Sequence, residues 1–131
     1  MVVGLGTDLV VIARIEHLLE RHGERFLTRV FTPREREECL SRPQVPQALA
    51  VRFAAKEATM KALGTGYRQG VKFQEIEVYH LPSGQPQLRL SGVAAEHARR
   101  LGATRPHVSL THDGGLGHAV VLLEGEPGCP A

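Results

Sequence analysis

Three observations predict that this chain folds as one α+β domain. Its 131 residues, 42% of them hydrophobic, are enough for one modest core. Helical periodicity dominates the first half, and short alternating segments separated by glycine and proline turns dominate the second. These strands follow one another rather than alternating with helices, which favours a small, mainly antiparallel sheet with packed helices over a βαβ arrangement.

Composition excludes several classes of protein. The net charge of +2 is too small to indicate nucleic-acid binding by itself. No apolar run approaches the roughly 20 residues of a membrane span. The opening residues lack the basic and apolar regions of a signal peptide, which predicts a cytoplasmic protein. Cys39 and Cys129 show no metal-ligand spacing, so both are expected to be free thiols.

The N-terminal segment predicts a strand over residues 2–6 that delivers Asp8 at its end. A carboxylate there either caps the next helix or, with a second carboxylate, ligates a metal. Residues 9–22 follow the 3.6 period of an amphipathic helix, on which Arg14 and Arg21 share one edge. That edge is either an ordinary charged surface or a basic stripe that docks an acidic partner helix.

The middle of the chain holds its main helix, predicted over residues 49–63 and ended by Gly64. A capping box at Thr32 begins a shorter helix before it, and a proline-containing link over residues 42–46 joins the two.

Glu57 and Lys61 lie side by side on one edge of the main helix, and Lys56 falls inside its apolar stripe. One interpretation is a solvated ion pair beside a snorkelling lysine. The other is an anion site, in which the Gly64-Thr65-Gly66 turn brings backbone N–H groups close to a phosphate.

The second half predicts four strands and one helix. His112 ends the third of these strands beside a glycine turn, where it is either a structural histidine or a phosphate contact. We expect one domain over residues 1–124 and a flexible tail over residues 125–131. The strands are expected at residues 75–80, 87–90, 107–111 and 117–123, and the helix at residues 91–101.

Three motifs resemble those of the bacterial holo-(acyl carrier protein) synthases. They are GLGTDLV at residues 4–10, RFAAKEA at residues 52–58 with KALG at residues 61–64, and VSLTHD at residues 108–113. The order and separation of the motifs also match, and together they span nearly the whole chain.

The resemblance implies a Mg²⁺-dependent 4′-phosphopantetheinyl transferase that serves fatty acid biosynthesis. Such enzymes move the phosphopantetheine arm of coenzyme A onto a serine of apo acyl carrier protein and release adenosine 3′,5′-bisphosphate. The family is usually a homotrimer with active sites between subunits. Neither a nucleic acid nor a membrane is implied as a partner.

The resemblance also assigns roles to single residues. Asp8 and Glu57 would bind Mg²⁺, and Lys61 would face the transferred phosphate, so these three form the implied catalytic set. Arg14 and Arg21 would dock the carrier protein. The implied coenzyme A contacts are Arg52, Lys61, Gly64, Thr65, Gly66 and His112, the last near the nucleotide part.

Two other functions stay open at this point. A broad-range phosphopantetheinyl transferase for polyketide- or peptide-synthase carriers usually has two such halves in a longer chain. A non-enzymatic trimeric binding module would be suggested by loss of Asp8, Glu57 or Lys61, and all three are present.

Overall fold

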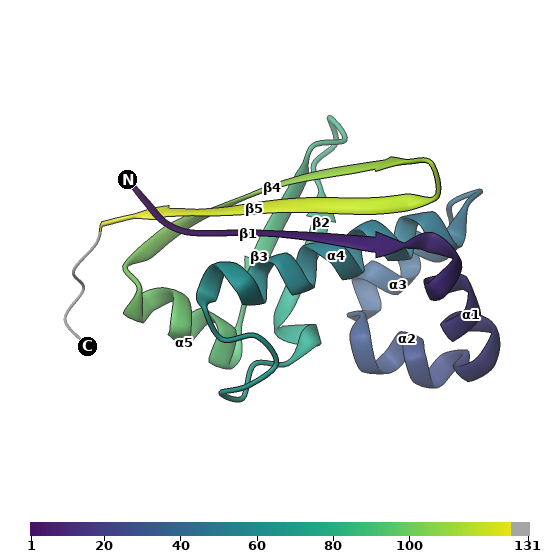
Figure 1. Cartoon of the computed structure of the whole chain (residues 1–131), viewed down its shortest axis with the longest axis horizontal. Helices are drawn as coiled ribbons and strands as arrows, with labels where there is room; N and C mark the ends of the chain where they lie inside the picture. The colour runs from purple at the N-terminus through teal and green to yellow at the C-terminus, as the bar shows by residue number, and fades with distance from the viewer. Residues whose placement is uncertain (127–131) are drawn as a thin grey trace.

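A computed structural model of the chain, which describes residues 1–126, has a mixed α+β fold (Figure 1) and confirms the predicted fold class. Cys129 and most of the predicted tail lie outside the described residues. Within the described part of the chain, no helix is long and apolar enough to cross a membrane.

Two antiparallel sheets form, where the sequence predicts one small sheet. The larger sheet has the order β1-β5-β4, so the first and last strands of the chain pair with each other. The smaller sheet is a hairpin of β2 and β3. The strands are β1 (Val2–Val11), β2 (Ile76–His80), β3 (Pro86–Leu90), β4 (Ala103–Asp113) and β5 (Leu116–Gly125).

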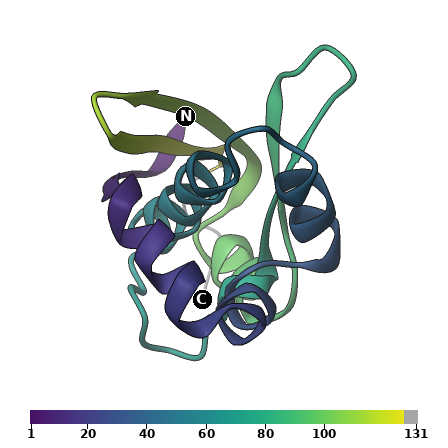
Figure 2. The same cartoon turned by 90° about the vertical axis from the view of Figure 1, so that its right-hand side faces the viewer.

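The helices gather around one central member. α4 runs beneath the three long strands, α1 to α3 cluster at one of its ends, and α5 lies toward the other (Figure 1). Figure 2 shows α4 nearly end-on, with the two hairpins projecting on either side of it. The helices are α1 (Ile12–His22), α2 (Glu24–Val30), α3 (Pro33–Leu40), α4 (Val45–Leu63) and α5 (Gly92–Arg100), and a 3₁₀ turn, η1, spans Phe73–Glu75.

Two glycines let β1 lie directly on α4. A Cβ added at Gly6 would stand 1.9 Å from the carbonyl oxygen of Ala58, and one at Gly4 would stand 2.4 Å from that of Ala62. Only a residue without a side chain allows backbones to approach this closely. The GLG of the first motif therefore sets the distance between β1, which carries Asp8, and α4, which carries Glu57 and Lys61.

The first strand is longer than predicted. β1 continues to Val11, which pairs with Leu116, so the predicted helix start at residue 9 is wrong and α1 begins at Ile12. The helical periodicity of residues 9–11 yields to pairing with a strand more than 100 residues away in sequence. Asp8 consequently lies within a strand rather than after one, and does not cap α1.

The central helix also begins earlier than predicted, at Val45, with Pro46 in its first turn. Proline is tolerated there because the first N–H groups of a helix have no intrahelical partner. The expected stiff link therefore ends at Gln44. The capping box of α3 is confirmed, since the Thr32 hydroxyl accepts from Glu35 N and the Glu35 carboxylate accepts from Thr32 N.

The strands of the C-terminal hairpin extend beyond both predicted ends. His112 and Asp113 belong to β4, and the turn is confined to Gly114 and Gly115. β5 includes Gly125, where the sequence predicts the tail to begin. Long-range pairing with β1 and β4 accounts for the added length, because the local pattern at these ends is polar or glycine-rich.

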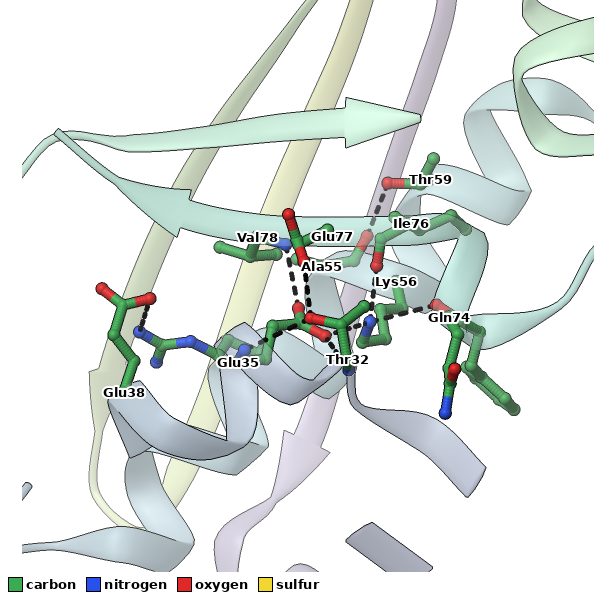
Figure 3. A network of polar contacts seen from close by, with 12 residues as sticks. Thr32, Glu35, Glu38, Ala55, Lys56, Thr59, Gln74, Ile76, Glu77 and Val78 are labelled. Carbon is green, nitrogen blue, oxygen red and sulfur yellow. Dashed lines mark hydrogen bonds and ion pairs between the residues drawn. The ribbon is translucent and has the colours of Figure 1, made fainter. Parts of the chain in front are cut away.

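Lys56 is the centre of a buried polar network (Figure 3). Its Nζ donates to Glu35 Oε1 at 2.7 Å and to the carbonyl oxygens of Phe73, at 3.0 Å, and Ile76. The second oxygen of Glu35 accepts from Val78 N at 2.8 Å. Both side chains are fully buried, so the interpretation of Lys56 as a snorkelling lysine is wrong. The network therefore joins α4, through Lys56, to α3 and to the β2 strand of the β2–β3 hairpin.

Candidate active site

The candidate site is built where β1 crosses the C-terminal half of α4. Asp8 lies on the inner face of β1, with a side chain only 11% exposed. Lys61 extends from α4 to the same strand, and its Nζ donates to Asp8 Oδ1 at 3.1 Å and to the Thr7 carbonyl oxygen at 2.9 Å. Lys61 therefore pairs with Asp8 across the two elements, rather than with Glu57 along the helix as predicted.

Glu57 is the second carboxylate of the site. Burial and the nearby Asp8 carboxylate raise the pKa of Glu57, against the opposing effects of a hydrogen bond from Tyr67 and of the Arg14 charge. The Tyr67 hydroxyl donates to Glu57 Oε1. The arrangement therefore places two acidic groups close enough for the charge of one to disfavour that of the other.

These residues fit a divalent cation. Asp8 Oδ2 is buried and accepts no hydrogen bond. Burying a carboxylate oxygen in this way costs free energy unless a bound ligand replaces the lost contacts with water. The crowded negative charge at Asp8 and Glu57 would be relieved by a cation, and Mg²⁺ commonly takes one or two carboxylates with the remaining positions left to water and phosphate. Within residues 1–126, no group of three or more His, Cys, Asp and Glu side chains is arranged around a metal site, so these two carboxylates would be its protein ligands.

The turn after α4 does not form the predicted phosphate cradle. The N–H of Gly64 donates to Lys61 O, and those of Thr65 and Gly66 both donate to Met60 O. Thr65 is buried, and its hydroxyl donates to the Gly66 carbonyl oxygen at 3.1 Å. With Gly64 in the left-handed conformation, the turn closes the helix end, so these donors are not free to bind an anion.

A second polar cavity, of about 380 Å³, holds the other predicted coenzyme A residues, Arg52 and His112. Arg52 is 1% exposed; its Nη2 donates to His80 Nδ1 at 3.2 Å and lies 3.9 Å from Glu38 Oε2. Arg52 Nε is buried without a hydrogen-bond partner.

His112 lines the same cavity. Gln47 Nε2 lies 3.2 Å from His112 Nε2, and Arg42 also lines the cavity. The guanidinium and imidazole groups that line this cavity suit a phosphate-bearing ligand.

The structure does not bring the two sets of residues together on one chain. Asp8 and Lys61 line a different cavity, of about 430 Å³, which they share with Thr7, Leu9 and His118. Arg52 and Lys61 are roughly two and a half helical turns apart, so they leave α4 on opposite faces, about 13 Å apart along its axis. The predicted coenzyme A residues therefore form two half-sites.

The predicted docking residues lie on the free surface of α1. Arg14 and Arg21 are both exposed, and Arg14 is close enough for its charge to lower the pKa of Glu57. α1 ends at His22, before Gly23, whose φ is +48°, and Arg25 and Arg29 of α2 line a cavity of about 410 Å³ together with His22. The basic stripe thus starts beside the carboxylates and extends away from them.

Sequence reasoning missed three residues of these sites. Tyr67, assigned only to a loop, contacts Glu57; His80 contacts Arg52; and the His118 ring lies 2.6 Å from the Thr7 hydroxyl oxygen at the edge of the first cavity. Each contact joins residues at least ten positions apart with no shared motif, so no local signal points to it.

Sequence comparisons identify relatives of this chain. The sequence profile of the 4′-phosphopantetheinyl transferase superfamily matches residues 4–115. A holo-(acyl carrier protein) synthase from Alkalilimnicola ehrlichii is 51% identical over 125 residues, covering 95% of this chain and 98% of the relative. One from Methylobacterium radiotolerans is 52% identical, covering 97% of this chain and 96% of the relative.

Solved structures show the same fold. The holo-(acyl carrier protein) synthase of Neisseria meningitidis superimposes with a TM-score of 0.86 at 35% identity, covering 95% of this chain and 99% of that one. The Helicobacter pylori enzyme in complex with coenzyme A superimposes with a TM-score of 0.81 at 32% identity, covering 92% and 99% of the two chains.

Proposed function

The chain belongs to the 4′-phosphopantetheinyl transferase superfamily, and from this premise we propose that it is a holo-(acyl carrier protein) synthase. It transfers the 4′-phosphopantetheine group of coenzyme A to a serine of apo acyl carrier protein. The observation that carries this assignment is the joint presence of Asp8, Glu57 and Lys61 at one crossing of β1 and α4, within a fold shared with a coenzyme A-bound relative.

The reaction exchanges one phosphorus–oxygen bond for another. The serine oxygen bonds to the phosphorus that carries the pantetheine arm, and the pyrophosphate bond of coenzyme A breaks. Adenosine 3′,5′-bisphosphate leaves with the bonding electrons, and the serine proton passes to a base. The base is either the half-buried Glu57 carboxylate or a water molecule oriented by Asp8 or Glu57.

Asp8 and Glu57 would hold Mg²⁺ at this site. The bound cation would neutralise charge that develops on the phosphate oxygens. Lys61 contributes an ammonium on a side chain that is 56% exposed, and Asp8 and the Thr7 carbonyl oxygen hold it at the site. Its exposure leaves donors available for an incoming phosphate, which supports its proposed role beside the transferred group.

A homo-oligomer, which the family resemblance implies to be a trimer, would unite the two half-sites. Exposed apolar side chains line the outer face of β1, including Leu5 (64% exposed) and Leu9 (61% exposed). β1 is also an edge strand, with one side unpaired within the described sheet. Large exposed apolar side chains on one strand face are typical of a protein interface. Packing it against a second copy would let one coenzyme A contact Asp8 and Lys61 on one chain and Arg52 and His112 on another.

The carrier protein is proposed to dock on α1. Arg14 and Arg21 form a basic edge that suits an acidic helix, and the edge leads to the carboxylates where the serine must arrive. Such complementarity would set both the encounter rate and the register of the carrier.

The test is a transfer assay read by intact mass. The protein is mixed with coenzyme A, Mg²⁺ and an apo acyl carrier protein, and we expect the carrier to gain one phosphopantetheine. A chelator or the nearly isosteric Asp8→Asn change should abolish the gain while the circular dichroism spectrum is unchanged. Full activity of a folded Asp8→Asn variant would refute the metal assignment.

The same assay separates the alternatives. A panel of apo carriers from polyketide and peptide synthases would reveal broad specificity, if those carriers react as fast as the fatty acid carrier. No transfer to any carrier by the folded protein would instead favour a non-enzymatic binding module.

A further inference from the structure

Tyr67 is a polar contact of the candidate metal site that neither the motifs nor the proposed reaction uses. It lies in the loop that follows α4, and its side chain is largely exposed, at 62%. Its hydroxyl nevertheless turns back onto the helix and donates to Glu57 Oε1. An exposed side chain would not keep this orientation by itself, so other contacts must hold the Tyr67 ring in place.

Two successive aromatic contacts link the Tyr67 ring to α4 through Phe73. It packs on Phe73 with ring centroids 5.6 Å apart, and Phe73 stacks on Phe53 of α4 at the same centroid distance, 5.6 Å. The loop bends back through Gly64 and through Gln69, whose φ is +67°. The Gln69 carbonyl oxygen lies 3.2 Å from His97 Nε2. The ring is thus anchored to the helix that carries Glu57.

The chemistry of the contact follows from which oxygen it uses. The tyrosine hydroxyl donates to Oε1 of Glu57, and the Asp8 carboxylate lies close enough to Glu57 to raise its pKa. Carboxylates that bind metals are commonly oriented by a hydrogen bond from a neighbouring group, which fixes the ligand atom and leaves the other oxygen for the ion. The geometry at Glu57 has this form.

We propose that Tyr67 is a positioning residue for Glu57, holding its carboxylate in the orientation that binds the divalent cation. This inference rests on the proposed metal site. A competing interpretation has the opposite consequence: if the hydroxyl only filled the position of the cation, it would have to leave before metal binds, and its removal would tighten binding.

The test measures metal affinity directly, without turnover. Mn²⁺ is titrated into wild type and Tyr67→Phe, and free Mn²⁺ is followed by its electron paramagnetic resonance signal. Tyr67→Phe keeps the ring and its packing, and removes only the hydroxyl. We expect its dissociation constant to rise about 10- to 100-fold, the usual effect of losing such a partner. An unchanged or a smaller constant would overturn the proposal.

The chain offers a matched control, because Tyr79 is its only other tyrosine. Tyr79 lies on β2, and the Arg34 guanidinium carbon is 4.7 Å from the centroid of its ring. Tyr79→Phe should leave Mn²⁺ affinity unchanged. Equal losses in both variants would indicate a general effect on the fold and would overturn the specific role of Tyr67.

Two further measurements separate this inference from the proposed function. Absence of Mn²⁺ binding by wild type would overturn the metal site and the Tyr67 role together, whereas binding lost in Asp8→Asn and unchanged in Tyr67→Phe would overturn the Tyr67 role alone. In the transfer assay, Tyr67→Phe should raise the Mg²⁺ concentration needed for half-maximal rate by the same factor, whereas Tyr79→Phe should leave it unchanged.

Discussion

Two lysines on α4 form ion pairs of opposite character. Lys56 and Glu35 are both fully buried, with Nζ 2.7 Å from Oε1, and every donor of the ammonium is used. Lys61 pairs with Asp8 at a similar distance, 3.1 Å, but its side chain is 56% exposed and Asp8 Oδ2 accepts nothing. The two pairs lie little more than one helical turn apart on the same helix.

The difference shows how to tell a structural pair from a functional one. Burial lowers the pKa of Lys56 despite the opposing effect of Glu35, so this pair exists only because surrounding groups complete its hydrogen bonds. The Lys61–Asp8 pair leaves a buried oxygen and an exposed ammonium with unused capacity. A metal ion would bind the free Asp8 oxygen, and a phosphate would accept a hydrogen bond from the exposed Lys61 ammonium.

The largest effect is expected from breaking the buried pair. Lys56→Met leaves Glu35 charged and without its partner in the interior, and we expect it to lower the free energy of unfolding by about 3–5 kcal/mol. Urea denaturation measures this loss. The double variant Lys56→Met/Glu35→Leu should be more stable than the single variant. A loss below about 1 kcal/mol in Lys56→Met would show that the comparison overstates the structural role of the pair.

The exposed pair should respond in the opposite way. Lys61→Met is expected to slow phosphopantetheine transfer about 10²–10³-fold, or about 2.7–4 kcal/mol in the barrier, as for removal of one preorganised charge. The free energy of unfolding should change by less than about 1 kcal/mol, because the Lys61 side chain is largely exposed and solvent screens its charge. Initial rates and urea denaturation on the same preparation provide both numbers. A large stability loss with little change in rate would remove the distinction between the two lysines.

A smaller effect on stability is expected where Arg52 contacts His80 and Glu38, because Arg52 Nε and Glu38 Oε2 are buried without a hydrogen-bond partner. Burial and the Arg52 guanidinium lower the pKa of His80 below its ordinary value of 6.5. The unfolded chain therefore binds this proton more readily. The contribution of His80 to stability is complete above pH 6.5 and is lost as the pH falls through the folded-state pKa.

His80→Gln should remove this part of the pH dependence. Thermal denaturation of both proteins, followed from about pH 7.5 to about pH 5, should show wild type losing more stability than the variant over the acidic part of the range. His17→Gln, on the exposed surface of α1, serves as the control. Parallel curves for wild type and His80→Gln would indicate that the Arg52–His80 contact does not couple to folding.

The family motifs point to a catalytic set of three residues, and the fold agrees with them. Asp8, Glu57 and Lys61 converge, as their motifs imply. The predicted coenzyme A residues, in contrast, do not lie together on one chain. The Gly64–Gly66 N–H groups close the end of α4, and Arg52 faces away from Lys61. A motif records which residues recur together, whereas the direction of each side chain depends on the helical turn between them.

The sequence by itself determined the α+β class, the presence of α1, α3 and α4, the capping box at Thr32 and the burial of the stripe that contains Lys56, whereas α2 was not predicted. These follow from local periodicity and from hydrogen bonds between near neighbours. Only the tertiary structure decided that β1 runs to Val11, that Lys61 pairs with Asp8 and that Tyr67 contacts Glu57. Each of these joins segments that are distant in sequence or lie across a turn, and their energy comes from contacts that no local pattern encodes.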